Sequence, residues 1–130
     1  MKYIPFILLL AGLVSSCFSE YRTFIDYSIQ NNSTSVITLS GSEIIHARNL
    51  DQTINPGDKV VLTEWTRMGR SIGQIEPSLI FGEDLVILNA TGDTLKKDFH
   101  DGKNWVQDLS TTRETATHKY EFEILDRDFR

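Results

Sequence analysis

Short segments in which apolar and polar residues alternate run along most of this chain. In residues 23–30, one face of an extended chain would carry Ile25, Tyr27 and Ile29, and the other Asp26, Ser28 and Gln30. Near the C-terminus, Tyr120, Phe122 and Ile124 alternate with polar residues in the same way. A period of two residues is that of a β-strand with one buried face. Both segments are therefore predicted to be half-buried strands.

Other strand-like segments lie between turns rich in Asn, Gly, Pro, Ser and Asp. We predict strands at residues 35–40, 43–50, 59–66, 85–88, 94–99 and 105–106, and a polar loop at 110–117. No segment keeps a helical apolar stripe for three turns. About seven or eight short strands separated by such turns predict an all-β fold. We expect an antiparallel β-sandwich, immunoglobulin-like in outline, with a partly open barrel as the alternative.

The segment Arg67–Asp84 differs from the rest of the chain. It contains three glycines, Pro77 and two arginines, Arg67 and Arg70, among scattered apolar residues. We interpret it as a long connection that presents side chains at the surface. Because a guanidinium pairs bidentately with carboxylates, Arg67 and Arg70 are candidate partner-binding residues. The alternative is that both only neutralise nearby carboxylates such as Glu64 or Glu83.

The first 17 residues have the layout of an export signal. Lys2 is followed by an apolar stretch from Ile4 to Val14, which is too short for a membrane span of about 20 residues. The stretch ends in Val14-Ser15-Ser16-Cys17, an aliphatic residue, two small residues and the only cysteine. This motif resembles the lipobox of bacterial lipoproteins. There are two alternatives. The segment could be an ordinary signal peptide with a chance cysteine, or a hydrophobic core strand.

The lipobox resemblance implies a diacylglycerol thioether on Cys17 and cleavage before that residue. A lone cysteine cannot form an internal disulfide, which agrees with this role. Two or three acyl chains would give stable attachment to a lipid bilayer. The expected organisation is a signal peptide at residues 1–16, the lipidated cysteine and a short tether at 17–21, and a β-sandwich domain at 22–130.

Charge limits the kinds of partner. Without Lys2, 12 basic and 18 acidic residues remain, a formal charge of −6. This negative charge argues against nucleic acid as a partner, because its phosphates require a basic surface. It also argues against binding of anionic lipid by a cluster of basic residues. With its lipobox and size, the chain resembles small uncharacterised lipoproteins of Bacteroidota.

The residues after Cys17 bear on the location of the protein. No Asp follows Cys17 to signal retention in the inner membrane, so we expect attachment to the outer membrane. Glu20 is a weak indication of export to the cell surface, and the face of the membrane stays open.

Three motifs carry candidate chemistry. Gly69-Arg70-Ser71-Ile72-Gly73 matches the nucleophile elbow of hydrolases, but Pro77 stands where that motif requires a helix, so a glycine-rich loop is the better interpretation. The histidines His46, His100 and His118 lack the spacing of a metal site, and we predict no metal and no cofactor. Asp93-Thr94-Leu95 resembles an O-glycosylation site of periplasmic proteins of Bacteroidota. Thr94 is therefore a candidate modification site, and Asp93 is also an ordinary turn residue.

No motif here assembles a set of catalytic residues on the expected sandwich. We therefore expect a non-enzymatic binding or accessory module that is held at the bacterial envelope and binds an unknown envelope protein or glycan. The alternative is an inhibitor or immunity protein that blocks the active site of a partner enzyme.

Overall fold

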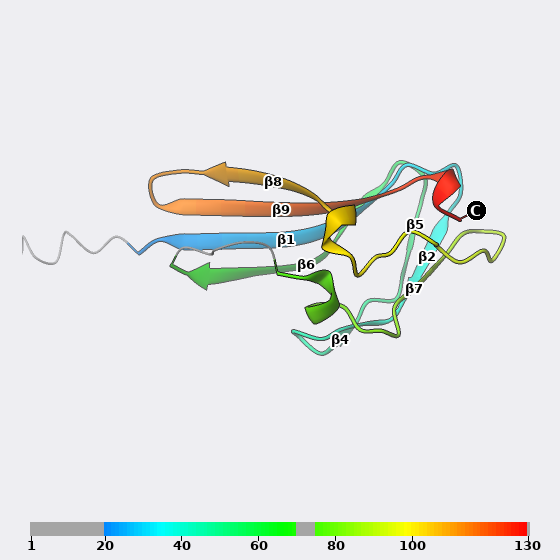
Figure 1. The fold of residues 1–130 in the computed structure, drawn as a ribbon, viewed down its shortest axis with the longest axis horizontal. Coiled ribbons are helices and arrows are strands. Elements are labelled where there is room, and N and C mark those ends of the chain that lie inside the picture. Colours follow the sequence, from blue (N-terminus) through cyan, green and yellow to red (C-terminus); the bar gives the residue numbers. More distant parts are fainter. Residues whose placement is uncertain (1–19, 70–74, 130) are drawn as a thin grey trace, which may run out of the picture.

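The computed structural model describes residues 20–69 and 75–129. Its largest sheet has four strands in the order β6 (Lys59–Met68), β1 (Arg22–Asn31), β9 (Thr115–Ile124) and β8 (Val106–Thr111). β1 pairs antiparallel with β6, and β8 pairs antiparallel with β9. The two central strands, β1 and β9, run parallel (Figure 1).

The pairing of β1 with β9 gathers the apolar faces of both strands. Tyr27 lies opposite Tyr120, and Ile29 opposite Phe122. All four side chains are buried. In this register the alternate residues of each central strand point into the same core, which is why both strands alternate so regularly in sequence.

A second, smaller sheet crosses one end of the long sheet (Figure 1). It contains β5 (Gln52–Ile54), β2 (Ile37–Ser40) and β7 (Val86–Leu88) in that order, all antiparallel. A small hairpin lies nearby and consists of two strands of two residues each, β3 (Ser42–Glu43) and β4 (Arg48–Asn49). Three 3₁₀ turns complete the described elements: η1 (Pro77–Leu79), η2 (Gly102–Asn104) and η3 (Asp126–Phe129).

The core between the sheets is largely aromatic. Tyr27 stacks on Tyr120 with ring centroids 4.6 Å apart, and its other neighbours include Trp105 at 5.2 Å. Phe122 packs on Phe99 with centroids 5.0 Å apart. The second sheet adds aliphatic side chains to the same cluster: Ile37, Leu39, Ile54 and Ile87. Both sheets therefore share one hydrophobic core.

The prediction of an all-β, sandwich-like fold is confirmed. Several details differ from the sequence interpretation. The central pair is parallel instead of antiparallel. The segment predicted as a polar loop, residues 110–117, forms the end of β8, a tight turn and the start of β9. All six residues of β8 are exposed, so this edge strand has no apolar face that could appear as alternation.

Two predicted strands are mostly irregular. Residues 94–99 contribute a single bridge, between Thr94 and Leu88, and the rest of that segment is not strand. Residues 43–50 fold into the small β3–β4 hairpin around a turn at 44–47, instead of one strand. In that turn Ala47 has a φ of 48°, a conformation that a continuous strand does not contain.

Candidate functional site

The β3–β4 hairpin and the segment around η1 pack together into one surface feature. The backbone N–H of Ile44 donates to the carbonyl of Ile80 at 2.6 Å, and that of Gly82 donates to the carbonyl of Ser42 at 2.8 Å. We call residues 42–49 with residues 76–84 the hairpin–loop surface. Ile80 and Phe81 are completely buried beneath it. The hairpin is thus held to the domain by backbone hydrogen bonds and by an apolar base.

A buried carboxylate holds the hairpin to the long sheet. The side chain of Glu43 is inaccessible to solvent and accepts hydrogen bonds from the Nε of Arg48 at 2.7 Å and from the hydroxyl of Thr63 on β6. The Nδ1 of His46 lies 2.8 Å from the same carboxylate. Arg48 also donates from Nη2 to the carbonyl of Leu62. The hairpin and β6 are therefore joined by a network of charge-assisted hydrogen bonds.

The network decides the protonation of Glu43. Burial by itself would raise the pKa of this carboxyl, but the hydrogen bonds from Thr63, Arg48 and His46, together with the charge of Arg48, hold the pKa below its usual value. The carboxylate is therefore ionised at neutral pH and its charge is compensated. In the described part of the chain, no hydroxyl or thiol hydrogen-bonds to the ring of His46. This arrangement serves to hold the hairpin in one conformation.

Three large apolar side chains lie exposed above this network. Ile44, Ile45 and Leu79 are 54%, 44% and 65% exposed, and we call them the apolar tip. The hydrogen bond from Ile44 to Ile80 places the turn of the hairpin beside η1, which contains Leu79. Single exposed apolar residues are common, but several on one rigid feature indicate an interaction site.

Of the two predicted binding residues, the described one, Arg67, does not belong to this surface. Arg67 is on β6, opposite Thr23, and its side chain is exposed. No ion pair joins it to Glu64 or Glu83 within residues 20–69 and 75–129. Arg70 lies outside the described residues, as do Ser71 of the G-x-S-x-G match and the lipidation candidate Cys17. The described residues of the segment 67–84 therefore lie mainly at the end of β6 and in the hairpin–loop surface.

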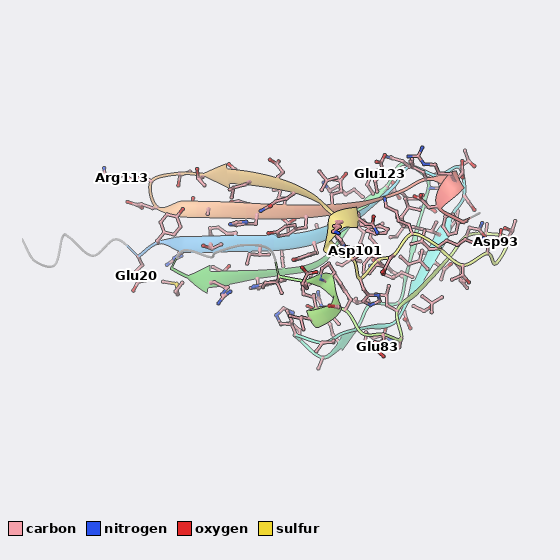
Figure 2. All side chains as sticks on the ribbon, viewed as in Figure 1. Glu20, Glu83, Asp93, Asp101, Arg113 and Glu123 are labelled. Atoms are coloured by element: carbon pink, nitrogen blue, oxygen red, sulfur yellow. The ribbon has the colours of Figure 1, made fainter. Side chains whose placement is uncertain are left out.

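Thr94 is exposed and follows Asp93, which lies at the end of the molecule opposite Glu20 (Figure 2). The neighbouring carboxylate of Asp93 accepts hydrogen bonds from the hydroxyl of Thr91 at 2.7 Å and the amide of Asn89 at 3.1 Å, and these lower its pKa. Asp93 thus closes the turn, which is the role expected of an ordinary turn residue at this position. The modification of Thr94 stays a prediction.

The three histidines occupy separate environments. His46 belongs to the hairpin network, the Nε2 of His100 lies 3.0 Å from the carbonyl of Gly82, and His118 is buried beside Gln107 and Tyr120. Among the described residues, no three His, Cys, Asp or Glu side chains are placed to share a metal ion.

The sequence interpretation missed the hairpin–loop surface except for its η1 side. Glu43 lies on the short strand β3, but nothing in the sequence pattern indicates that its charge is buried. The only local signal is the pair Ile44-Ile45 directly after it, which breaks the alternation expected of a half-buried strand. Two of the partners of Glu43, Arg48 on β4 and Thr63 on β6, meet it only when the chain is folded.

Within the described ranges, no helix is long and apolar enough to cross a membrane. Comparison with models of protein families, with curated proteins and with solved structures found no match to this chain.

Proposed function

We propose that this protein is a lipid-anchored lipoprotein of the bacterial envelope that acts as a non-enzymatic binding module. The observation that supports this proposal is the apolar tip, three aliphatic side chains exposed on the rigidly held hairpin and on the adjoining η1. Burying one such side chain completely contributes roughly 1.5–3 kcal/mol. Because the hairpin is already ordered, a partner that covers the tip gains this free energy with little loss of conformational entropy.

The chemistry of the tip favours a protein partner over a glycan. Ile44, Ile45 and Leu79 offer aliphatic surface, which complements an apolar pocket. The half-exposed Arg48 and His46 lie beside them and suit a rim that contains carboxylates. We therefore propose an envelope protein with an apolar pocket and an acidic rim as the partner.

The anchor in this proposal is an acylated Cys17. β1 begins at Arg22, so residues 17–21 would be the only tether; five extended residues reach about 17 Å. The domain would thus remain near the lipid surface, with outer-membrane attachment as the expected location.

Cys17→Ser tests the anchor. We expect the variant to lose incorporation of radiolabelled fatty acid and to keep its signal peptide. The measurements are acyl labelling and the mass of the mature chain. A mature protein of unchanged mass and unchanged membrane partition would contradict the lipoprotein proposal.

The double variant Ile44→Asp with Leu79→Asp tests the binding surface. We expect it to lose a partner that the parent retains after cross-linking in intact cells, while its thermal midpoint stays near that of the parent. Val61→Asp is the matched control, since Val61 on β6 is 50% exposed and lies outside the hairpin–loop surface. Equal retention by all three proteins, or equal loss in the double variant and the control, would contradict the proposal.

A second candidate function is inhibition of an enzyme. A rigid projecting hairpin is also the shape that enters an active-site cleft, and pre-organised inhibitors of this kind change little on binding. The retained partner decides between the two functions. If the partner is an enzyme whose turnover falls when the parent is added and recovers with the double variant, the protein is an inhibitor; unchanged turnover supports the accessory module.

A further inference from the structure

β8 is an edge strand, and no element of residues 20–69 and 75–129 pairs with its outer side. It forms one margin of the four-stranded sheet (Figure 1), and all six of its residues are exposed. Two large apolar side chains, Val106 and Leu109, are 66% and 52% exposed on it. An edge of this kind offers backbone hydrogen-bonding groups to another strand.

The β8–β9 turn identifies which groups are free. Thr112 donates its N–H to the carbonyl of Thr115 at 2.8 Å and so forms a hydrogen-bonded pair at the turn. In an antiparallel ladder, such pairs alternate with non-hydrogen-bonded pairs. The continuous register from Val106↔Glu121 to Thr111↔Ala116 then leaves three residues with both peptide groups pointing away from β9. These residues are Gln107, Leu109 and Thr111.

The two edge strands of the long sheet differ in the features that prevent pairing with another strand. β6, at the other margin, has a register irregularity where it pairs with Tyr27 and Ser28, and it contains Lys59 and Arg67. Bulges and basic residues are features that prevent strand-to-strand association. β8 has the sequence VQDLST, with no Lys, Arg or Pro, and its register has no irregularity. Only the β8 margin is therefore ready to pair.

We propose that two copies of this chain associate through β8, antiparallel, with a two-fold axis at Leu109. In this register, Leu109 of one copy lies opposite Leu109 of the other, and Gln107 lies opposite Thr111. All three outward-pointing residues of each copy are then paired, and the sheet continues from four strands to eight. The two half-exposed leucines cover each other.

Charge selects this register over its neighbours. With the axis at Leu109, Asp108 faces Ser110 of the second copy. An axis at Asp108 would place the two aspartates directly opposite each other, and an axis at Thr111 would place Asp108 opposite Glu114. Like charges in these positions destabilise a strand pair. An axis at Ser110 would require Gln107 to pair with Arg113, which lies in the turn beyond the end of β8.

A single cysteine tests the two-fold axis. Paired residues at the axis would have Cα atoms about 5.5 Å apart, within the range of a disulfide. We therefore expect full-length Leu109→Cys to form a covalent dimer under mild oxidation. Ser110→Cys is the matched control, because its two copies would lie about 8 Å apart and cannot be bridged. The parent, with Cys17 alone, gives the background.

A charge at the axis should separate the copies. Leu109→Lys places two ammonium groups opposite each other, whereas the lysine of Val106→Lys faces Thr112 of the second copy. Only Leu109→Lys should therefore raise the concentration at the monomer–dimer midpoint, by about tenfold or more. Sedimentation of the full chain in detergent measures this midpoint. A parent that is monomeric throughout, equal cross-linking of both cysteine variants, or equal dimerisation of both lysine variants would overturn the proposal. Cross-linking of Leu109→Cys only to a different protein would also overturn it and would identify a foreign strand at β8.

Discussion

At the scale of single residues, Glu43 is the group on which the candidate site depends. Its carboxylate joins β3 to β4 through Arg48 and to β6 through Thr63. A buried charge is tolerated in a protein only where such donors compensate it, since removing one partner leaves the others unsatisfied. The apolar tip is therefore rigid because of a polar network below it.

Glu43→Gln should lower the free energy of unfolding at pH 7 by about 1–3 kcal/mol, because charge-assisted hydrogen bonds become neutral ones or are lost. Glu83→Gln is the control. Glu83 is exposed on the same surface (Figure 2), so its change should stay within about 0.5 kcal/mol. Urea unfolding of both variants and the parent measures the difference. Equal stability of all three would show that the network contributes nothing.

The pH dependence of the same comparison follows from the lowered pKa of Glu43. A carboxyl whose folded pKa lies below its unfolded value of 4.5 stabilises the fold fully above that value. The contribution disappears as the pH falls through the folded pKa. The stability difference between parent and Glu43→Gln should therefore be constant near neutral pH and shrink in acid below pH 4.5.

At the scale of elements, the four-stranded sheet combines strands of opposite character. β9 lies in the middle and buries every second residue, whereas β8 lies at the margin and is exposed throughout. Both are strands because their backbones are paired with each other. Their side chains therefore contribute very unequally to stability.

Phe122→Ala on β9 should cost about 3–5 kcal/mol, because it removes a ring in contact with Phe99 and Trp105 and leaves a cavity. Val106→Ala on β8 should cost less than about 0.5 kcal/mol, since that side chain is mostly exposed. Thermal unfolding followed by circular dichroism compares the two variants. A loss at Val106 as large as that at Phe122 would contradict the exposed position of this side chain at the margin of the sheet.

At the scale of the whole molecule, the two sheets are parts of one cooperative unit. Tyr27 of β1, Leu39 of β2 and Phe99 between the sheets all belong to one buried cluster. Neither sheet has an apolar core of its own to retain when the other separates. Folding of the described domain should therefore be all-or-none.

Urea unfolding should give the same midpoint by two probes. Tryptophan fluorescence follows Trp65 and Trp105, of which Trp105 is buried in the aromatic core, and far-ultraviolet circular dichroism follows the strands of both sheets. The spectrum should be dominated by sheet, with little helix. Two separated midpoints would show instead that the small sheet unfolds independently.

The sequence by itself determined the strands that have one buried and one polar face. In β1, and in β9 from Lys119 onward, alternation of side chains follows from the geometry of an extended chain, so it is visible without any knowledge of the partner strand. Turns such as Asn55-Pro56-Gly57-Asp58 were equally visible, because these residues act on their own local backbone. From these elements the all-β, sandwich-like fold could be predicted.

Only the tertiary structure decided which strands pair and where charges are buried. β1 and β9 pair in parallel, and each pair of facing residues is 93 positions apart in the sequence. No local sequence pattern indicates whether two such distant strands run parallel or antiparallel. The end of β8 at residues 110–111 resembled a loop because an exposed margin imposes no apolar period. The burial of Glu43 could not be predicted because the donors that make it favourable, Arg48 and Thr63, meet it only when the chain is folded.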